Sequence, residues 1–87
     1  KIQKEKILNL FEELAEKMNI NIVHGKGDFV GGMCSINDEE FLVLNKLKPI
    51  DQRLNVLATE FSKINLNNVF IPPVLREFIS NSQQGLF

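Results

Sequence analysis

The sequence of 87 residues is poor in residue types on which many small proteins depend: it has one cysteine, one histidine, and no tryptophan or tyrosine. A single cysteine, Cys34, cannot close an internal disulfide, which argues against a disulfide-stapled secreted domain. A single histidine, His24, excludes a metal site built from several histidines of one chain. The sequence shows neither a secretory leader nor a run of about 18 apolar residues. We therefore expect a cytoplasmic protein without a membrane-spanning segment.

The chain also lacks a surplus of charge of either sign. Its 10 lysine and arginine residues are balanced by 11 aspartate and glutamate residues, and the formal net charge is -1. Proteins that bind nucleic acid or anionic lipid usually carry a basic surplus on one face. We therefore expect neither a nucleic acid nor a membrane among the partners of this protein.

Apolar residues make up 44% of the chain, which is enough for one hydrophobic core but not for two. We assign residues 1–80 to a single domain. Residues 81–87 form a polar tail, which we expect to fray.

The helical spacing of apolar residues predicts three helices. The apolar residues of the first are Ile7, Leu10, Phe11, Leu14 and Met18. The second begins at Pro49, because proline is tolerated in the first turn of a helix. Its apolar stripe consists of Ile50, Leu54, Leu57, Ala58, Phe61 and Ile64. The third starts at Pro72-Pro73 and is expected to face inward with Val74, Leu75, Phe78 and Ile79.

Short runs of β-branched or apolar residues, separated by turn-forming residues, predict strands over 20–24, 30–36 and 41–45. The third run is apolar almost throughout, so we expect this strand to be central and buried on both faces. Strand alternation places Cys34 on the same face as Ile36, which we expect to point inward. The predicted fold is α+β, a small antiparallel three-stranded sheet packed by helices, in the order α-β-β-β-α-α.

The strand that ends at Asn45 and the helix that follows Pro49 carry a resemblance to a known family. The order of elements and the helix residues Arg53-Leu54, Leu57-Ala58 and Glu60-Phe61 resemble the ImmA/IrrE-type small metallopeptidases. The resemblance covers about residues 20 to 64. It implies a helix with a His-Glu-x-x-His motif, in which two histidines bind zinc and the glutamate takes a proton from the metal-bound water.

In this sequence the corresponding segment is degenerate and reads Thr59-Glu60-Phe61-Ser62-Lys63. Only Glu60 matches, since Thr59 and Lys63 stand where the histidines would be. Threonine is a poor zinc ligand, and the lysine ammonium would repel a cation. The resemblance therefore implies a domain whose catalysis has been lost. The chain is otherwise similar to small bacterial proteins with a Gly-Gly hairpin, an apolar strand and a Pro-Pro start to the last helix.

Three groups of candidate site residues have both a functional and a structural interpretation. Glu60 lies at the border of the apolar stripe, where a solvated flanking residue is expected. Cys34 and His24 could form a catalytic dyad if the first two strands pair, but a cysteine in an apolar strand is usually an inert small hydrophobe. Gly25-Lys26-Gly27 lacks the spacing of a phosphate-binding loop and is expected to be a flexible connection. We therefore assign no catalytic, cofactor-binding or metal-binding residue.

The functional prediction is a non-catalytic, cytosolic protein-interaction or self-associating module, with another protein or a second copy as partner and a homodimer as one form. A small sheet exposes at least one edge, and such edges pair readily with other chains. One alternative is an enzyme relic or a hydrolase-like site around Glu60. Another is a carrier of a small apolar ligand, with a cavity between sheet and helices lined by Phe11, Phe41, Phe61 and Phe70.

Overall fold

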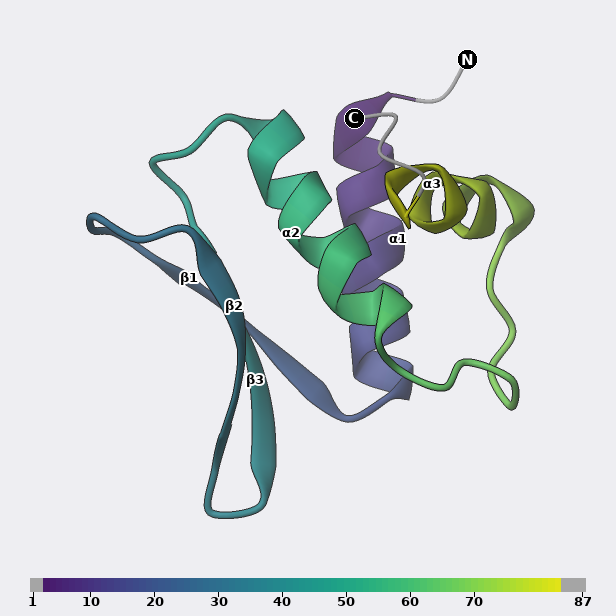
Figure 1. Cartoon of the computed structure of the whole chain (residues 1–87), viewed down its shortest axis with the longest axis horizontal. Coiled ribbons are helices and arrows are strands. Elements are labelled where there is room, and N and C mark those ends of the chain that lie inside the picture. The colour runs from purple at the N-terminus through teal and green to yellow at the C-terminus, as the bar shows by residue number, and fades with distance from the viewer. Residues whose placement is uncertain (1–2, 84–87) are drawn as a thin grey trace.

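The computed structural model describes residues 3–83, which form three helices and three strands in the order α-β-β-β-α-α (Figure 1). The predicted α+β class and element order are therefore confirmed. The elements are α1 (Lys4–Lys17), β1 (Ile20–Gly25), β2 (Gly31–Ile36), β3 (Glu39–Asn45), α2 (Ile50–Ser62) and α3 (Pro73–Gln83).

The sheet has the strand order β1-β3-β2, with β3 in the centre as predicted. β2 and β3 are antiparallel, whereas β1 runs parallel to β3, so the sheet is mixed and the prediction of a purely antiparallel sheet was wrong. The reason is the connection over residues 26–30, which carries the chain across the end of β3 to its far side. Two strand spacings amount to about 10 Å, a gap that five residues span easily.

The tight turn between β2 and β3 is made by Asn37 and Asp38. Both residues have positive φ, at 52° and 68°. A two-residue turn with this backbone matches the right-handed twist of the strands that it joins, and asparagine and aspartate tolerate it better than most residues. The turn sets the register in which Met33 lies opposite Leu42 and Cys34 opposite Phe41.

The crossing connection is held by Asn45, the only buried polar side chain among residues 3–81. Its amide nitrogen donates to the carbonyl oxygens of Gly27 at 2.7 Å and Phe29 at 2.6 Å. Its amide oxygen accepts a hydrogen bond of 3.0 Å from the Leu47 N–H. A buried amide is tolerated only when it is hydrogen-bonded in this way, and here it joins the end of β3 to the loop that passes over it.

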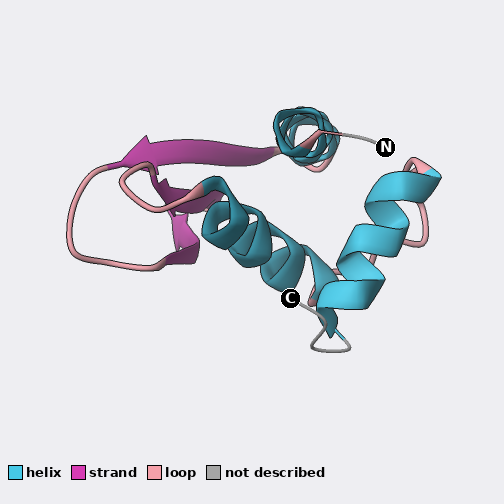
Figure 2. Cartoon of the chain, turned by 90° about the horizontal axis from the view of Figure 1, so that it is seen from above, coloured by secondary structure: helices cyan, strands magenta, loops and turns pink. Residues whose placement is uncertain are grey.

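All three helices lie on one side of the sheet, and the core lies between them and the sheet (Figures 1 and 2). Leu42 and Leu44 of β3 point into this core and are fully buried. From α2, the predicted stripe contributes Leu54, Leu57, Ala58 and Phe61. Burying one such large side chain stabilises the fold by roughly 1.5–3 kcal/mol.

Three phenylalanine rings, one from each helix, connect α1, α2 and α3. Phe11 of α1 stacks on Phe61 of α2 with ring centroids 5.7 Å apart, and it meets Phe78 of α3 edge-on at 6.0 Å. Aromatic pairs in these geometries add about 0.5–1.5 kcal/mol beyond the area that they bury. The stripe predicted for the first helix is thus the surface on which α2 and α3 pack.

No helix within residues 3–83 covers the other face of the sheet. Phe41 and Val43 of β3 are half-buried on this face, and Ile36 of β2 is 56% exposed. Cys34 is also exposed, so the expectations of an inward cysteine and of a third strand buried on both faces were wrong. The register is the cause: with Met33 opposite the buried Leu42, the next residue, Cys34, must point to the uncovered face.

The last helix, α3, includes the first residues of the tail predicted over 81–87. α3 continues to Gln83, so the predicted tail 81–87 starts inside this helix, and residues 84–87 lie outside the described residues. None of the helices within residues 3–83 combines the length and the apolar character needed to cross a membrane.

Candidate functional site

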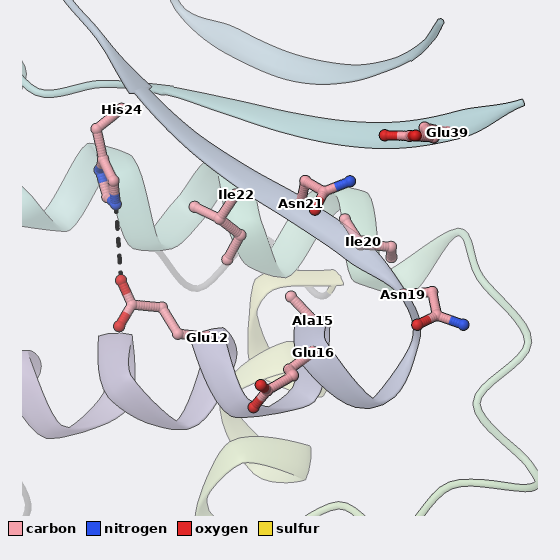
Figure 3. Close-up of a pocket in the computed structure, with 9 residues that line it drawn as sticks. All are labelled: Glu12, Ala15, Glu16, Asn19, Ile20, Asn21, Ile22, His24 and Glu39. Carbon is pink, nitrogen blue, oxygen red and sulfur yellow. Dashed lines mark ion pairs between the residues drawn. The ribbon is translucent and has the colours of Figure 1, made fainter. Parts of the chain in front are cut away.

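A groove of about 620 Å³ runs between α1 and the outer edge of β1 (Figure 3). Its lining is shared by α1, the turn after it, β1 and the first residue of β3. The residues that define this edge groove are Glu12, Ala15, Glu16, Asn19, Ile20, Asn21, Ile22, His24 and Glu39. It is the candidate functional site because it borders both a free strand edge and a group of charged side chains.

The groove exists because the chain reverses sharply between α1 and β1. The backbone N–H of Met18 bonds to the carbonyls of Leu14 and Ala15 at the end of the helix. Asn19 then adopts a left-handed conformation, with φ at 59°, and turns the chain back beside α1. Ile20 is buried and holds the start of β1 against the core, whereas His24 at the far end is exposed.

The backbone of β1 directs some of its hydrogen-bonding groups away from β3 and toward this groove. The Gly25 carbonyl accepts a hydrogen bond of 2.9 Å from the Lys46 N–H, so Gly25 faces β3. Alternate residues of a strand direct their N–H and C=O groups to opposite sides. Ile20, Ile22 and His24 therefore direct theirs away from β3. Within residues 3–83, β1 pairs with no strand other than β3.

Apart from His24, the ionisable side chains that line the edge groove are carboxylates. Glu12 and Glu16 stand one turn apart on α1, and Glu39 lies beyond β1 on β3 (Figure 3). No lysine or arginine is among the described residues that line the groove. At one end, Glu12 Oε2 lies 3.6 Å from His24 Nε2, and this contact links α1 to the last part of β1.

The sequence-based candidates Cys34 and His24 are not brought together. Their strands, β2 and β1, are separated by β3, and their partners on β3 are Phe41 and Leu44. Partners three residues apart lie on opposite faces of a strand. His24 thus stands on the helix side of the sheet and Cys34 on the uncovered side, which excludes a direct dyad.

Glu60 and its neighbours lie on the flank of α2. Thr59 and Lys63 are exposed, and the Lys63 ammonium lies 3.4 Å from Glu60 Oε2. The ammonium group therefore lies beside the carboxylate of Glu60. Within residues 3–83, no group of three or more histidine, cysteine, aspartate or glutamate side chains could hold a metal ion.

The four phenylalanines suggested for a ligand cavity do not line a common space. Phe11 and Phe61 fill the core, Phe41 lies on the uncovered face of the sheet, and Phe70 is 71% exposed. The structure has an apolar groove elsewhere, between the helices, lined in part by Ile7, Leu54, Val74 and Phe78. The ion pair between Lys4 and Asp51, at 2.7 Å, stands at its rim.

The edge groove was not anticipated from the sequence. The signal present there is the spacing of Glu12 and Glu16, four residues apart on the flank of the first helix, followed by a strand free of lysine and proline. Such a strand lacks the residues that usually protect a sheet edge. The strand order is not evident from the sequence, however. If β1 paired with β2 instead of β3, a different side of the sheet would lie next to α1.

Comparison with protein-family models, curated proteins and solved structures gave no match to this chain. Its function is therefore argued from the geometry of the site alone.

Proposed function

We propose that this chain is a non-catalytic protein-interaction module that binds a segment of another protein as an added strand on β1. The observation that carries the proposal is the row of outward-facing N–H and C=O groups at Ile20, Ile22 and His24, next to an open groove. A fourth strand placed there would use these backbone groups, as in other cases of strand addition.

β1 is the better suited of the two edges of the sheet. The other edge strand, β2, begins with Gly31 at φ +117° and Gly32 at φ +154°, so its first part is not a regular strand. β1 contains no glycine before its last residue, and its six residues pair with β3 without a bulge. A regular edge without lysine or proline is one that other strands can join.

The enzyme and carrier alternatives receive less support. Glu60 is paired with Lys63, and among the described residues it belongs to no group of three or more side chains that could hold a metal ion. The cytoplasm is the compartment we propose, because a free, exposed thiol such as Cys34 is typical of reducing conditions. A second copy of the chain is the other candidate partner for the edge.

The test is a selection of binders from a random-peptide display library, with two substitutions at one position. His24→Pro removes an outward N–H without breaking a bond to β3, and His24→Ala removes the imidazole but keeps that N–H. If strand addition is correct, the selected peptides bind His24→Pro at least about tenfold more weakly than His24→Ala. Circular dichroism and thermal unfolding verify that both variants fold.

A second measurement makes the test independent of the folding of the proline variant. In ¹⁵N-labelled wild-type protein, a bound peptide should shift the amide signals of Ile20, Ile22 and His24 and slow their hydrogen exchange. Equal binding to both His24 variants, or an absence of any selected peptide, would contradict the proposal. A protein that is dimeric by light scattering, and monomeric as His24→Pro, would assign the edge to a second copy.

A further inference from the structure

We infer that the segment added to β1 is a basic extended peptide from a different protein, with lysine or arginine at alternate positions facing α1. The inference rests on the proposed function, since it names the chemistry of the strand that would occupy the edge. It is carried by the charge of the edge groove and by the spacing of its carboxylates.

The groove concentrates negative charge that the chain as a whole does not have. Glu12, Glu16 and Glu39 contribute three carboxylates, whereas the formal net charge of the chain is only -1. His24 is the one imidazole at this edge, and no lysine or arginine balances the carboxylates among the described lining residues. An incoming strand therefore meets an acidic surface along one side, and basic side chains complement it.

The spacing of the carboxylates suits a strand. Glu12 and Glu16 are four residues apart on a helix, which corresponds to about 6 Å along its axis. Side chains on one face of a strand recur every two residues, at about 6.7 Å. Two basic residues at positions i and i+2 of an added strand, on its helix-facing side, can therefore approach Glu12 and Glu16 together.

A second copy fits the same edge less well. Pairing of β1 with β1 of another copy across a two-fold axis would place equivalent surfaces against each other. Glu12 and Glu16 of one copy would then lie beside the same residues of the other, with like charges in proximity and no basic residue of the groove to separate them. Like charges that face each other in this way disfavour pairing.

The experiment compares three synthetic peptides of about eight residues, a usual strand length, with acetylated and amidated ends. Valine alternates with lysine in the first, with glutamine in the second and with glutamate in the third. Dissociation constants are measured by fluorescence anisotropy with the wild-type chain, and HSQC spectra report whether the β1 amides respond. We expect the lysine peptide to bind at least about fivefold more tightly than the glutamine peptide, and the glutamate peptide to bind most weakly.

A matched pair of double variants locates the charge effect. Glu12→Gln with Glu16→Gln removes the carboxylates of α1 that line the groove, and should reduce the preference for lysine over glutamine to about twofold or less. Glu5→Gln with Glu13→Gln removes the same charge from exposed positions of α1 outside the groove, and should retain the preference. Raising the salt concentration should weaken the lysine peptide more than the glutamine peptide.

The outcomes distinguish a failure of this inference from a failure of the proposed function. If all three peptides bind β1 with equal affinity, the basic partner is wrong and strand addition stands. If the lysine peptide binds equally to both pairs of glutamate variants, or does not shift the β1 amides, its lysine side chains interact with another part of the surface. The inference is then overturned. If no peptide binds and the display selection also yields none, both proposals fall.

Discussion

The side-chain nitrogen of Asn45 lies 2.6 Å from the carbonyl oxygen of Phe29, a contact that joins the end of the central strand to the loop crossing over it. A second hydrogen bond to Gly27 starts from the same nitrogen. This loop carries the chain from β1 to β2, so the contact stabilises the arrangement in which β3 lies between them. The free edge of β1 depends on that arrangement.

Substitution of Asn45 should therefore destabilise the whole fold. Asn45→Ala removes three hydrogen bonds and leaves two loop carbonyls without their donor, which should lower the free energy of unfolding by about 2–4 kcal/mol. Asn45→Asp should cost more, because a carboxylate would face both carbonyl oxygens in a buried position. Urea unfolding followed by circular dichroism measures both.

Asn21→Ala is the matched control for the loss of an asparagine amide. Asn21 is exposed and donates one hydrogen bond, at 3.2 Å, to the carbonyl of Glu40. We expect it to cost less than about 1 kcal/mol. Similar costs for Asn45→Ala and Asn21→Ala would contradict the role given to the crossing loop.

The two glycines of β2 should differ in their tolerance of a methyl group. At Gly31, with φ +117°, an added Cβ would lie 2.5 Å from the backbone oxygen of Val43, so Gly31→Ala should cost on the order of 3 kcal/mol or more. At Gly32, with φ +154°, the nearest atom is Glu60 Oε2 at 4.0 Å, and about 1 kcal/mol is expected. Thermal unfolding of the two alanine variants, side by side, provides the comparison, and an inverted order would refute the close approach of β2 to β3.

The phenylalanines should divide into core and surface residues. Phe61 is fully buried and stacks on Phe11, so Phe61→Leu should lower the free energy of unfolding by roughly 1–1.5 kcal/mol, and Phe61→Ala by about 3–5 kcal/mol. Phe70 is exposed, and Lys17 Nζ lies 5.8 Å from its ring centroid, so Phe70→Leu should cost less than about 1 kcal/mol. Chemical denaturation of the leucine pair tests the assignment, since equal losses would mean that Phe70 also belongs to the core.

The thiol of Cys34 should react in the native protein. Because its side chain is exposed on the uncovered face of the sheet, we expect a small disulfide reagent to label it at a rate within about tenfold of that in the unfolded chain. Absorbance of the released thiolate follows the reaction. Protection by orders of magnitude would show that another surface covers this face in solution.

The local elements were largely predictable because their signals lie within the elements themselves. The stripe from Leu54 to Phe61 repeats with the period of a helix, and such a pattern has one apolar face whatever it packs against. The turn at Asn37 and Asp38 followed from residue types that tolerate positive φ. The apolar run from Phe41 indicated a central strand, and β3 is central.

Errors arose where a long-range choice decided the outcome. The alternation around Cys34 identified two faces of the strand but not which one meets the helices, and the wrong face was chosen. The predicted direction of β1, antiparallel to its neighbour in the sheet, was wrong for a similar reason. A five-residue connection permits either an adjacent antiparallel pair or a crossing over β3, and only the contacts of Asn45 favour the second.

The amino-acid sequence by itself determined where the helices and strands form, because periodicity, turn residues and proline positions act over a few neighbouring residues. It also determined that these 87 residues contain one cysteine and one histidine, so that they can form neither an internal disulfide nor a site with several histidines. Only the tertiary structure decided which face of the sheet is covered, which strand is left at an open edge, and that Glu12, Glu16 and Glu39 line the groove beside that strand. These properties depend on pairing and packing between residues far apart in the chain, where several arrangements satisfy the same local preferences and the best-packed, fully hydrogen-bonded one prevails.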